Sequence, residues 1–119
     1  MNLFSQLFNP SHTPQVDPAQ VSAMLAQSPK PYLLDVRTPD EYKQGHISGA
    51  ELIPLDELPN RLNEIPKDQQ ILVICHSGNR SKQGRDILVN AGYNAVSMTG
   101  GLLAWIDKGY PLDGTPPAQ

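Results

Sequence analysis

The segment QILVIC, residues 70–75, limits the possible folds of this chain more than any other feature, because its residues 71–75 are all apolar. An unbroken apolar run of this length is typical of a strand that other elements cover on both faces. Strands of that kind lie inside parallel sheets, whose connections are helices packed on the faces of the sheet. The sequence therefore predicts an α/β fold in which 70–75 forms a central strand.

Segments of similar length elsewhere in the chain alternate between strand and helix patterns. The other predicted strands are YLLDV at 32–36, AELI at 50–53 and NAVSM at 94–98. The predicted helices begin after Asp17 and after Thr38, and cover LPNRLNEI at 58–65, SKQGRDILVNAGY at 81–93 and GGLLAWIDKGY at 100–110. This alternation favours a mainly parallel sheet. Ligands bind such sheets at the carboxyl ends of the strands, which here directs attention to residue 75.

Two of the helix starts carry the same local signature. Asp17 and Thr38 are good N-cap residues, a proline follows each of them, and Gln20 or Glu41 stands three residues after the cap. This pattern predicts a capping box, in which the cap and the third helical residue exchange hydrogen bonds. Glu41 is also spaced for an ion pair with Arg37, although the capping box explains it better.

The length and charge of the chain limit its organisation and its partners. Its 119 residues suffice for one domain, expected over 17–111, between an N-terminal extension at 1–16 and a C-terminal tail at 112–119. Residues 9–16 are expected to form a loop, and the closing PLDGTPPAQ is expected to fray. The formal net charge of -3 predicts no general attraction to nucleic acid or to an anionic membrane. An anionic ligand must therefore be bound by a local arrangement of donors.

The chain has one cysteine. A single thiol excludes an internal disulfide framework and a metal site built from several thiolates, and we expect neither a metal nor a cofactor. An unpaired thiol suits a reducing compartment, which predicts the cytoplasm. No apolar run has the length needed to cross a bilayer, and the first residues lack the pattern of a signal peptide.

The cysteine, Cys75, stands at the end of the predicted central strand, where a short polar loop leads into a helix. The N-terminus of a helix favours negative charge, so we expect the thiol to ionise readily. Gly78 allows the loop to turn successive N–H groups toward the sulfur, and Arg80 adds a planar cation suited to a sulfonate or phosphate. The alternative is a cysteine that only fills the core. The polar residues after Cys75 favour the reactive thiolate.

Other notable side chains have structural explanations that we prefer. His76 could act as a base beside the cysteine, but filling the loop is the better interpretation. We expect His46 to be hydrogen-bonded, Trp105 to lie in the core, and Asp35 to anchor the loop near the site through hydrogen bonds.

Three segments together resemble the rhodanese-type sulfurtransferases. CHSGNRS at 75–81 is similar to the active-site loop of that family, LLDVRTPDEYKQGHISGAELIP at 33–54 to its DVR and GHIxGA hallmarks, and GGLLAW at 100–105 to its last hallmark. The similarity runs from about residue 17 to residue 111, with the motifs in the family's order. It implies a rhodanese-like, three-layer α/β/α fold around a central parallel five-stranded sheet, with Cys75 carrying a transferable sulfur as a persulfide.

The resemblance also implies roles for the residues around Cys75. The thiolate would take a sulfane sulfur from a small anionic donor, such as thiosulfate or another persulfide or polysulfide, and pass it to cyanide, a thiol or a protein. Asp35 and Arg37 of the DVR hallmark would support the site. The residues expected to bind substrate are His76, Ser77, Gly78, Asn79, Arg80 and Ser81.

Two alternatives differ from this interpretation in testable ways. Cysteine phosphatases and related arsenate reductases also combine a cysteine, an anion-binding loop and an arginine, but they place five residues between the two, whereas residues 76–79 are four. The smaller ring suits one sulfur atom better, and no acid for a leaving group is evident. The second alternative is a module on the same fold that only carries a persulfide or binds a protein.

Overall fold

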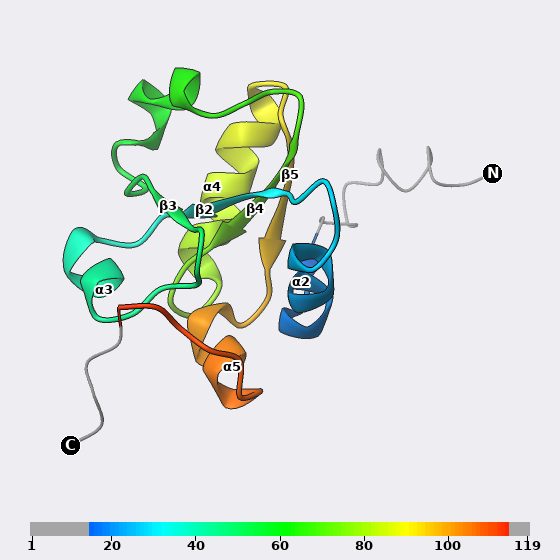
Figure 1. The fold of residues 1–119 in the computed structure, drawn as a ribbon. Coiled ribbons are helices and arrows are strands. Elements are labelled where there is room, and N and C mark those ends of the chain that lie inside the picture. The colour runs from blue at the N-terminus through cyan, green and yellow to red at the C-terminus, as the bar shows by residue number, and fades with distance from the viewer. Residues whose placement is uncertain (1–14, 115–119) are drawn as a thin grey trace.

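The computed structural model describes residues 15–114, which form a single sheet with helices on both of its faces (Figure 1). All strand pairs in the sheet are parallel, and the strand order is β1-β5-β4-β2-β3. The strands are β1 (Gln15–Val16), β2 (Tyr32–Asp35), β3 (Glu51–Leu52), β4 (Gln70–Ile74) and β5 (Asn94–Met98). The prediction of a parallel five-stranded sheet is confirmed.

β4 is the middle strand, as its apolar run predicted, and its side chains are buried on both faces. Ile71 and Val73 belong to one core cluster and Leu72 and Ile74 to the other, and all four are fully buried. Because both faces of the strand are covered at residues 71–74, none of these positions can be polar without a buried partner. The continuous apolar sequence follows from this placement.

Helices complete the two outer layers. They are α2 (Pro18–Leu25), α3 (Pro39–Lys43), α4 (Asn79–Asn90) and α5 (Gly101–Asp107). Leu88 of α4 packs into the cluster that holds Ile71, whereas Val21 of α2 and Trp105 of α5 pack into the cluster that holds Leu72. The two helices α2 and α5 therefore share one face of the sheet, and α4 covers the other.

Both predicted capping boxes are present. The Asp17 carboxylate accepts from the N–H of Gln20 at 2.8 Å, and the Gln20 side chain accepts from the N–H of Asp17 at 2.9 Å. Thr38 and Glu41 make the same reciprocal pair at 3.2 and 3.0 Å. These bonds satisfy N–H groups that the first turn of a helix leaves without partners.

Residues 58–65 do not form the predicted α-helix. They form two 3₁₀ turns, η1 (Leu58–Asn60) and η2 (Leu62–Glu64), and Arg61 between them leaves the helical region at φ -127° and ψ 18°. The Arg61 guanidinium pairs with Glu57 on one side and Glu64 on the other. No side chain caps the segment at Glu57, and the break in the backbone at Arg61 leaves two short turns where the pattern suggested a continuous helix.

The ends of the domain also differ from expectation. Gln15 and Val16, predicted as loop, form the edge strand β1 beside Ser97 and Met98 of β5. Two residues are too few to show a strand pattern, and their pairing with β5 alone defines them. The segment expected to fray is held at Asp113, which forms an antiparallel bridge with His46. Residues 1–14 and 115–119, the rest of the predicted extension and tail, lie outside the described residues.

The helix predicted over 81–93 begins earlier, at Asn79, because Gly78 is its cap. It ends before Gly92, which has the expected left-handed φ of +93°. Arg80 therefore belongs to the first turn of α4 and not to the loop. Across residues 15–114, no helix has both the length and the apolar character that crossing a membrane requires.

Candidate active site

Cys75 lies directly after β4, at the carboxyl end of the central strand, and is 1% exposed. The chain turns back at once, and the N–H of Gly78 donates to the Cys75 Sγ at 3.0 Å. Gly78 has a left-handed φ of +108° and caps the 12-residue helix α4. The loop is therefore curled over the sulfur, which faces the N-terminus of a helix where N–H dipoles favour negative charge.

The residues of the loop divide into exposed and buried ones. His76, Ser77 and Asn79 are exposed, whereas the side chain of Ser81 is fully buried and its hydroxyl donates to the carbonyl of Gly78 at 3.1 Å. Ser81 thus braces the loop from its interior side. A ligand can reach the side chains of His76, Ser77 and Asn79.

A second backbone segment packs tightly against the loop. The N–H groups of Leu102 and Leu103 donate to the carbonyls of Cys75 and His76, at 2.8 and 3.1 Å. Gly101 has a φ of +62°, and a Cβ atom there would overlap the carbonyl of His76. Gly101 of GGLLAW therefore allows the start of α5 to touch the backbone of the loop.

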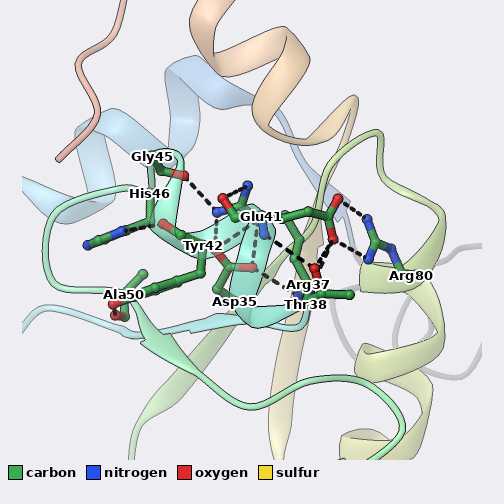
Figure 2. Close-up of polar contacts among 9 residues, drawn as sticks. All are labelled: Asp35, Arg37, Thr38, Glu41, Tyr42, Gly45, His46, Ala50 and Arg80. Carbon is green, nitrogen blue, oxygen red and sulfur yellow. Dashed lines mark hydrogen bonds and ion pairs between the residues drawn. The ribbon is translucent and has the colours of Figure 1, made fainter. Parts of the chain in front are cut away.

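Asp35 and Arg37 form a buried ion pair beside the loop (Figure 2). The Arg37 Nη2 donates to Asp35 at 2.7 Å and to the carbonyl of Gly45 at 2.9 Å, and Nη1 donates to the carbonyl of Glu41 at 3.3 Å. Asp35 was expected to anchor the cysteine loop, but these bonds anchor α3 and the turn after it. The predicted role of Asp35 was therefore wrong in its target: the pair of Asp35 and Arg37 supports α3 and not the cysteine loop.

Arg80 makes a two-pronged ion pair with Glu41, from α4 to α3 (Figure 2). The Arg80 Nη1 and Nη2 donate to Glu41 Oε1 and Oε2 at 2.7 and 2.8 Å. Hydrogen bonds from Arg80 and then from Thr38 lower the pKa of Glu41 from 4.5 to about 2, against burial, which raises it. The hydrogen bond to Glu41 in turn raises the pKa of Arg80.

The sequence did not predict this ion pair. It indicated only a capping-box bond for Glu41 and a possible ion pair with Arg37. The two residues are 39 positions apart, so no local spacing reveals them. A topological signal existed: α3 and α4 follow β2 and β4, which are neighbours in the sheet, so the starts of the two helices meet at one edge.

The structural interpretations of His46 and Trp105 agree with their surroundings. The His46 Nδ1 lies 2.9 Å from the carbonyl of Tyr42, and the two rings stack with centroids 3.8 Å apart. Trp105 is 4% exposed and donates to the carbonyl of Pro111 at 2.9 Å. Both side chains hold the chain around the site.

Two cavities flank the Arg80 and Glu41 pair. One, of about 290 Å³, is lined by Arg37, Glu41, Gln44, His76, Leu103 and Ile106, among others. The other, of about 530 Å³, is lined by Arg37, Thr38, Pro54, Leu55, Arg80 and Gln83, among others. Within residues 15–114, no three His, Cys, Asp or Glu side chains gather where they could hold a metal ion. The arrangement offers a buried sulfur, N–H dipoles and a neutralised cation.

Comparison with known proteins places this fold and site in one family. The family described as Rhodanese-like domain matches residues 17–108. A sulfurtransferase of Allochromatium vinosum is 38% identical over 99 residues, covering 82% of this chain and 92% of that protein. A thiosulfate sulfurtransferase, GlpE, of Tolumonas auensis is 36% identical over 87 residues, covering 72% of this chain and 82% of that protein. The chain belongs to the rhodanese-like domain family.

Solved structures support the same assignment. A rhodanese-related protein from Thermoplasma volcanium superposes with a TM-score of 0.80 at 32% identity, covering 85% of this chain and 98% of that one. The fold predicted from the resemblance is thus confirmed. The names of the relatives support sulfur transfer of the rhodanese type as the general class of activity.

The contact between Gly101 and the loop predicts a large effect of Gly101→Ala. The methyl group would overlap the carbonyl of His76 and lie in a left-handed backbone, so we expect the free energy of unfolding to fall by about 3 kcal/mol. Gly109→Ala is the matched control, because Gly109 has a φ of +85° with no atom within 4 Å of its Cβ position. Strain alone predicts a loss of about 1 kcal/mol there. Equal losses in urea denaturation would contradict the contact.

The lowered pKa of Glu41 predicts a pH dependence of stability. A carboxyl whose pKa is lower in the folded chain stabilises the fold fully above its ordinary pKa of 4.5 and loses that contribution as the pH falls toward about 2. We therefore expect wild type to exceed Glu41→Gln in unfolding free energy by about 1 kcal/mol above pH 5, and the difference to shrink below it. A difference that stays constant in urea titrations down to about pH 2.5 would show that the pair contributes no such stability.

Proposed function

We propose that the protein is a sulfurtransferase that moves a sulfane sulfur through a persulfide on Cys75. The observation that carries this proposal is the position of the Cys75 Sγ, at the end of β4 and under the N–H of Gly78 at the start of α4. These dipoles stabilise a sulfur anion, whether it is the thiolate or the outer atom of a persulfide. Proposed donors are thiosulfate and other persulfides or polysulfides.

The first step with thiosulfate is a displacement at sulfur. The Cys75 thiolate attacks the outer sulfur of thiosulfate, a new S–S bond forms, and the S–S bond of thiosulfate breaks. Sulfite departs with the electron pair, so the total charge of -3 is the same on both sides. No proton moves in this step, and a partner base is not needed when the nucleophile is already ionised.

The second step returns the enzyme to its thiolate. A thiophilic acceptor, such as cyanide, a thiol or a protein, attacks the outer sulfur of the persulfide and leaves Cys75 as the anion that the Gly78 N–H stabilises. The burial of Cys75 keeps bulk water from the inner sulfur. The whole cycle is a double displacement on one cysteine.

The family relatives support thiosulfate as a donor, because the relative from Tolumonas auensis is named for it. In this chain the candidate for contact with the sulfonate oxygens is Arg80, whose planar fork fits an oxyanion. His76, Ser77 and Asn79 provide the exposed side chains around that position. A protein that only carries a persulfide for a partner would load the same cysteine but lack turnover with small acceptors.

We expect Cys75→Ser to abolish sulfur transfer with little loss of fold, because the two side chains are similar in size. The measurement is intact-protein mass after incubation with thiosulfate. Wild type should gain the mass of one sulfur atom and lose it on addition of cyanide, while the variant gains nothing. Transfer retained by the folded variant would remove Cys75 from the mechanism, and a wild type that gains no sulfur from thiosulfate or polysulfide would contradict the proposed function.

We expect Arg80→Ala to lower kcat/KM for thiosulfate by about 10-fold to 100-fold, which corresponds to about 1.5–3 kcal/mol for a charge-assisted contact. The loss includes the Glu41 carboxylate, which would be left without its cation and would repel the donor. Lys82→Ala is the matched control, since it removes an exposed cation from the same helix. An unchanged kcat/KM in Arg80→Ala would show that Arg80 does not meet the donor.

A further inference from the structure

Arg80, the cation proposed to contact the sulfur donor, is already paired with Glu41 in the protein. Both terminal nitrogens of Arg80 donate to the two carboxylate oxygens of Glu41, in the fork-to-fork geometry of a strong ion pair (Figure 2). An anionic donor would use the same nitrogens. The donor and Glu41 therefore compete for Arg80.

Glu41 is held in place independently of Arg80. Its Oε1 accepts from the N–H and the hydroxyl of Thr38, which fixes the carboxylate at the start of α3. The helix is in turn fastened by Arg37, whose guanidinium binds the carbonyls of Glu41 and Gly45 and is itself paired with Asp35. The carboxylate thus stays near Arg80 when a ligand arrives.

The surroundings of the pair allow this competition to affect binding. The side chains of Glu41 and Arg80 are 31% and 33% exposed, and each lines one of the two cavities that flank them. Arg37 lines both cavities, but its charge is buried against Asp35. An anion entering from either side meets a pair whose net charge is zero.

We propose that Glu41 determines specificity by acting as a fixed internal anion, which disfavours dianionic sulfur donors relative to donors of lower charge. This inference deepens the proposed function and rests on it. The physical reason is that the repulsion between a fixed charge and a ligand scales with the charge of the ligand. A dianion such as thiosulfate is penalised twice as much as a monoanion at the same position.

The test uses two donors that react in the same way but differ in charge. Thiosulfate carries two negative charges and releases sulfite, and methanethiosulfonate carries one and releases methanesulfinate. In each case the Cys75 thiolate attacks the outer sulfur, the S–S bond of the donor breaks, and the leaving group departs with the electron pair. The ratio of kcat/KM for the two donors therefore reports the charge preference of the site.

Glu41→Gln is the informative variant because it removes the charge and can keep the cap. The other capping box of this chain already uses glutamine at the same position, in Gln20 of α2. We expect kcat/KM to rise about 5-fold for thiosulfate and about 2-fold for methanethiosulfonate. The repulsion energy is proportional to the charge of the donor, so the monoanion loses half as much energy as the dianion, and its fold-change is the square root of that for the dianion. The higher kcat/KM should come from a lower KM, with kcat little changed.

Glu57→Gln is the matched control. It removes the same charge from an exposed ion pair with Arg61 and should leave the ratio of the two donors unchanged. Equal changes for both donors in Glu41→Gln, or a fall for thiosulfate, would overturn the proposal and show that Glu41 only positions Arg80.

A binding measurement separates this inference from the proposed function. Sulfate is an unreactive dianion, and its affinity for Cys75→Ser can be compared by calorimetry with its affinity for the double variant Cys75→Ser, Glu41→Gln. Tighter sulfate binding by the double variant supports the competition even if wild type transfers no sulfur. Equal affinities overturn the competition even if wild type is an active sulfurtransferase.

Discussion

The hydrogen bond from the N–H of Gly78 to the Cys75 Sγ is the contact on which the rest of the site depends. It requires a left-handed backbone at Gly78, and a Cβ there would lie only 3.1 Å from the backbone N of Gly100. The carbonyls of Cys75 and His76 are meanwhile bonded to the first N–H groups of α5. Two glycines, at 78 and 101, thus allow the two backbones to meet, because a side chain at either position would crowd the facing segment.

Two ion pairs extend from the interior to the surface beside this loop. The inner pair, Asp35 with Arg37, is buried, and burial of two charges is costly unless further hydrogen bonds satisfy them. The carbonyls of Gly45 and Glu41 supply those bonds and tie the end of β2 to α3. The outer pair then joins α3 to α4 through Glu41 and Arg80. The hydrogen bonds of Asp35 and Arg37 therefore position α3 and Glu41, whereas the backbone of the cysteine loop is bonded to Leu102 and Leu103.

The features that the sequence predicted correctly are those coded by neighbouring residues. The central strand followed from a run of apolar residues at 71–75, and the starts of α2 and α3 followed from cap, proline and third residue. The features that it missed depend on partners far along the chain. Gln15 and Val16 form a strand only because they pair with β5, and Glu41 contacts Arg80 only because β2 and β4 are neighbours in the sheet. The prediction for residues 58–65 was wrong for another reason, since no side chain caps the segment at Glu57 and the backbone at Arg61 leaves the helical region.

The charges around Cys75 also help to explain why a loop with four residues between cysteine and arginine suits sulfur chemistry. Because Gly78 caps α4, the helix begins at Asn79, Arg80 lies in its first turn, and the Arg80 guanidinium reaches Glu41 on the neighbouring helix. The carboxylate of Glu41 then offsets the charge of Arg80, while the N–H of Gly78 lies directly against the Cys75 sulfur. An N–H placed on the sulfur suits the single charge of a thiolate or a persulfide. The group that Cys75 would carry in sulfur transfer is one sulfur atom, whereas a phosphoryl group carried there has three oxygens that each need a closely placed donor, so the same loop suits sulfur transfer better than phosphoryl transfer.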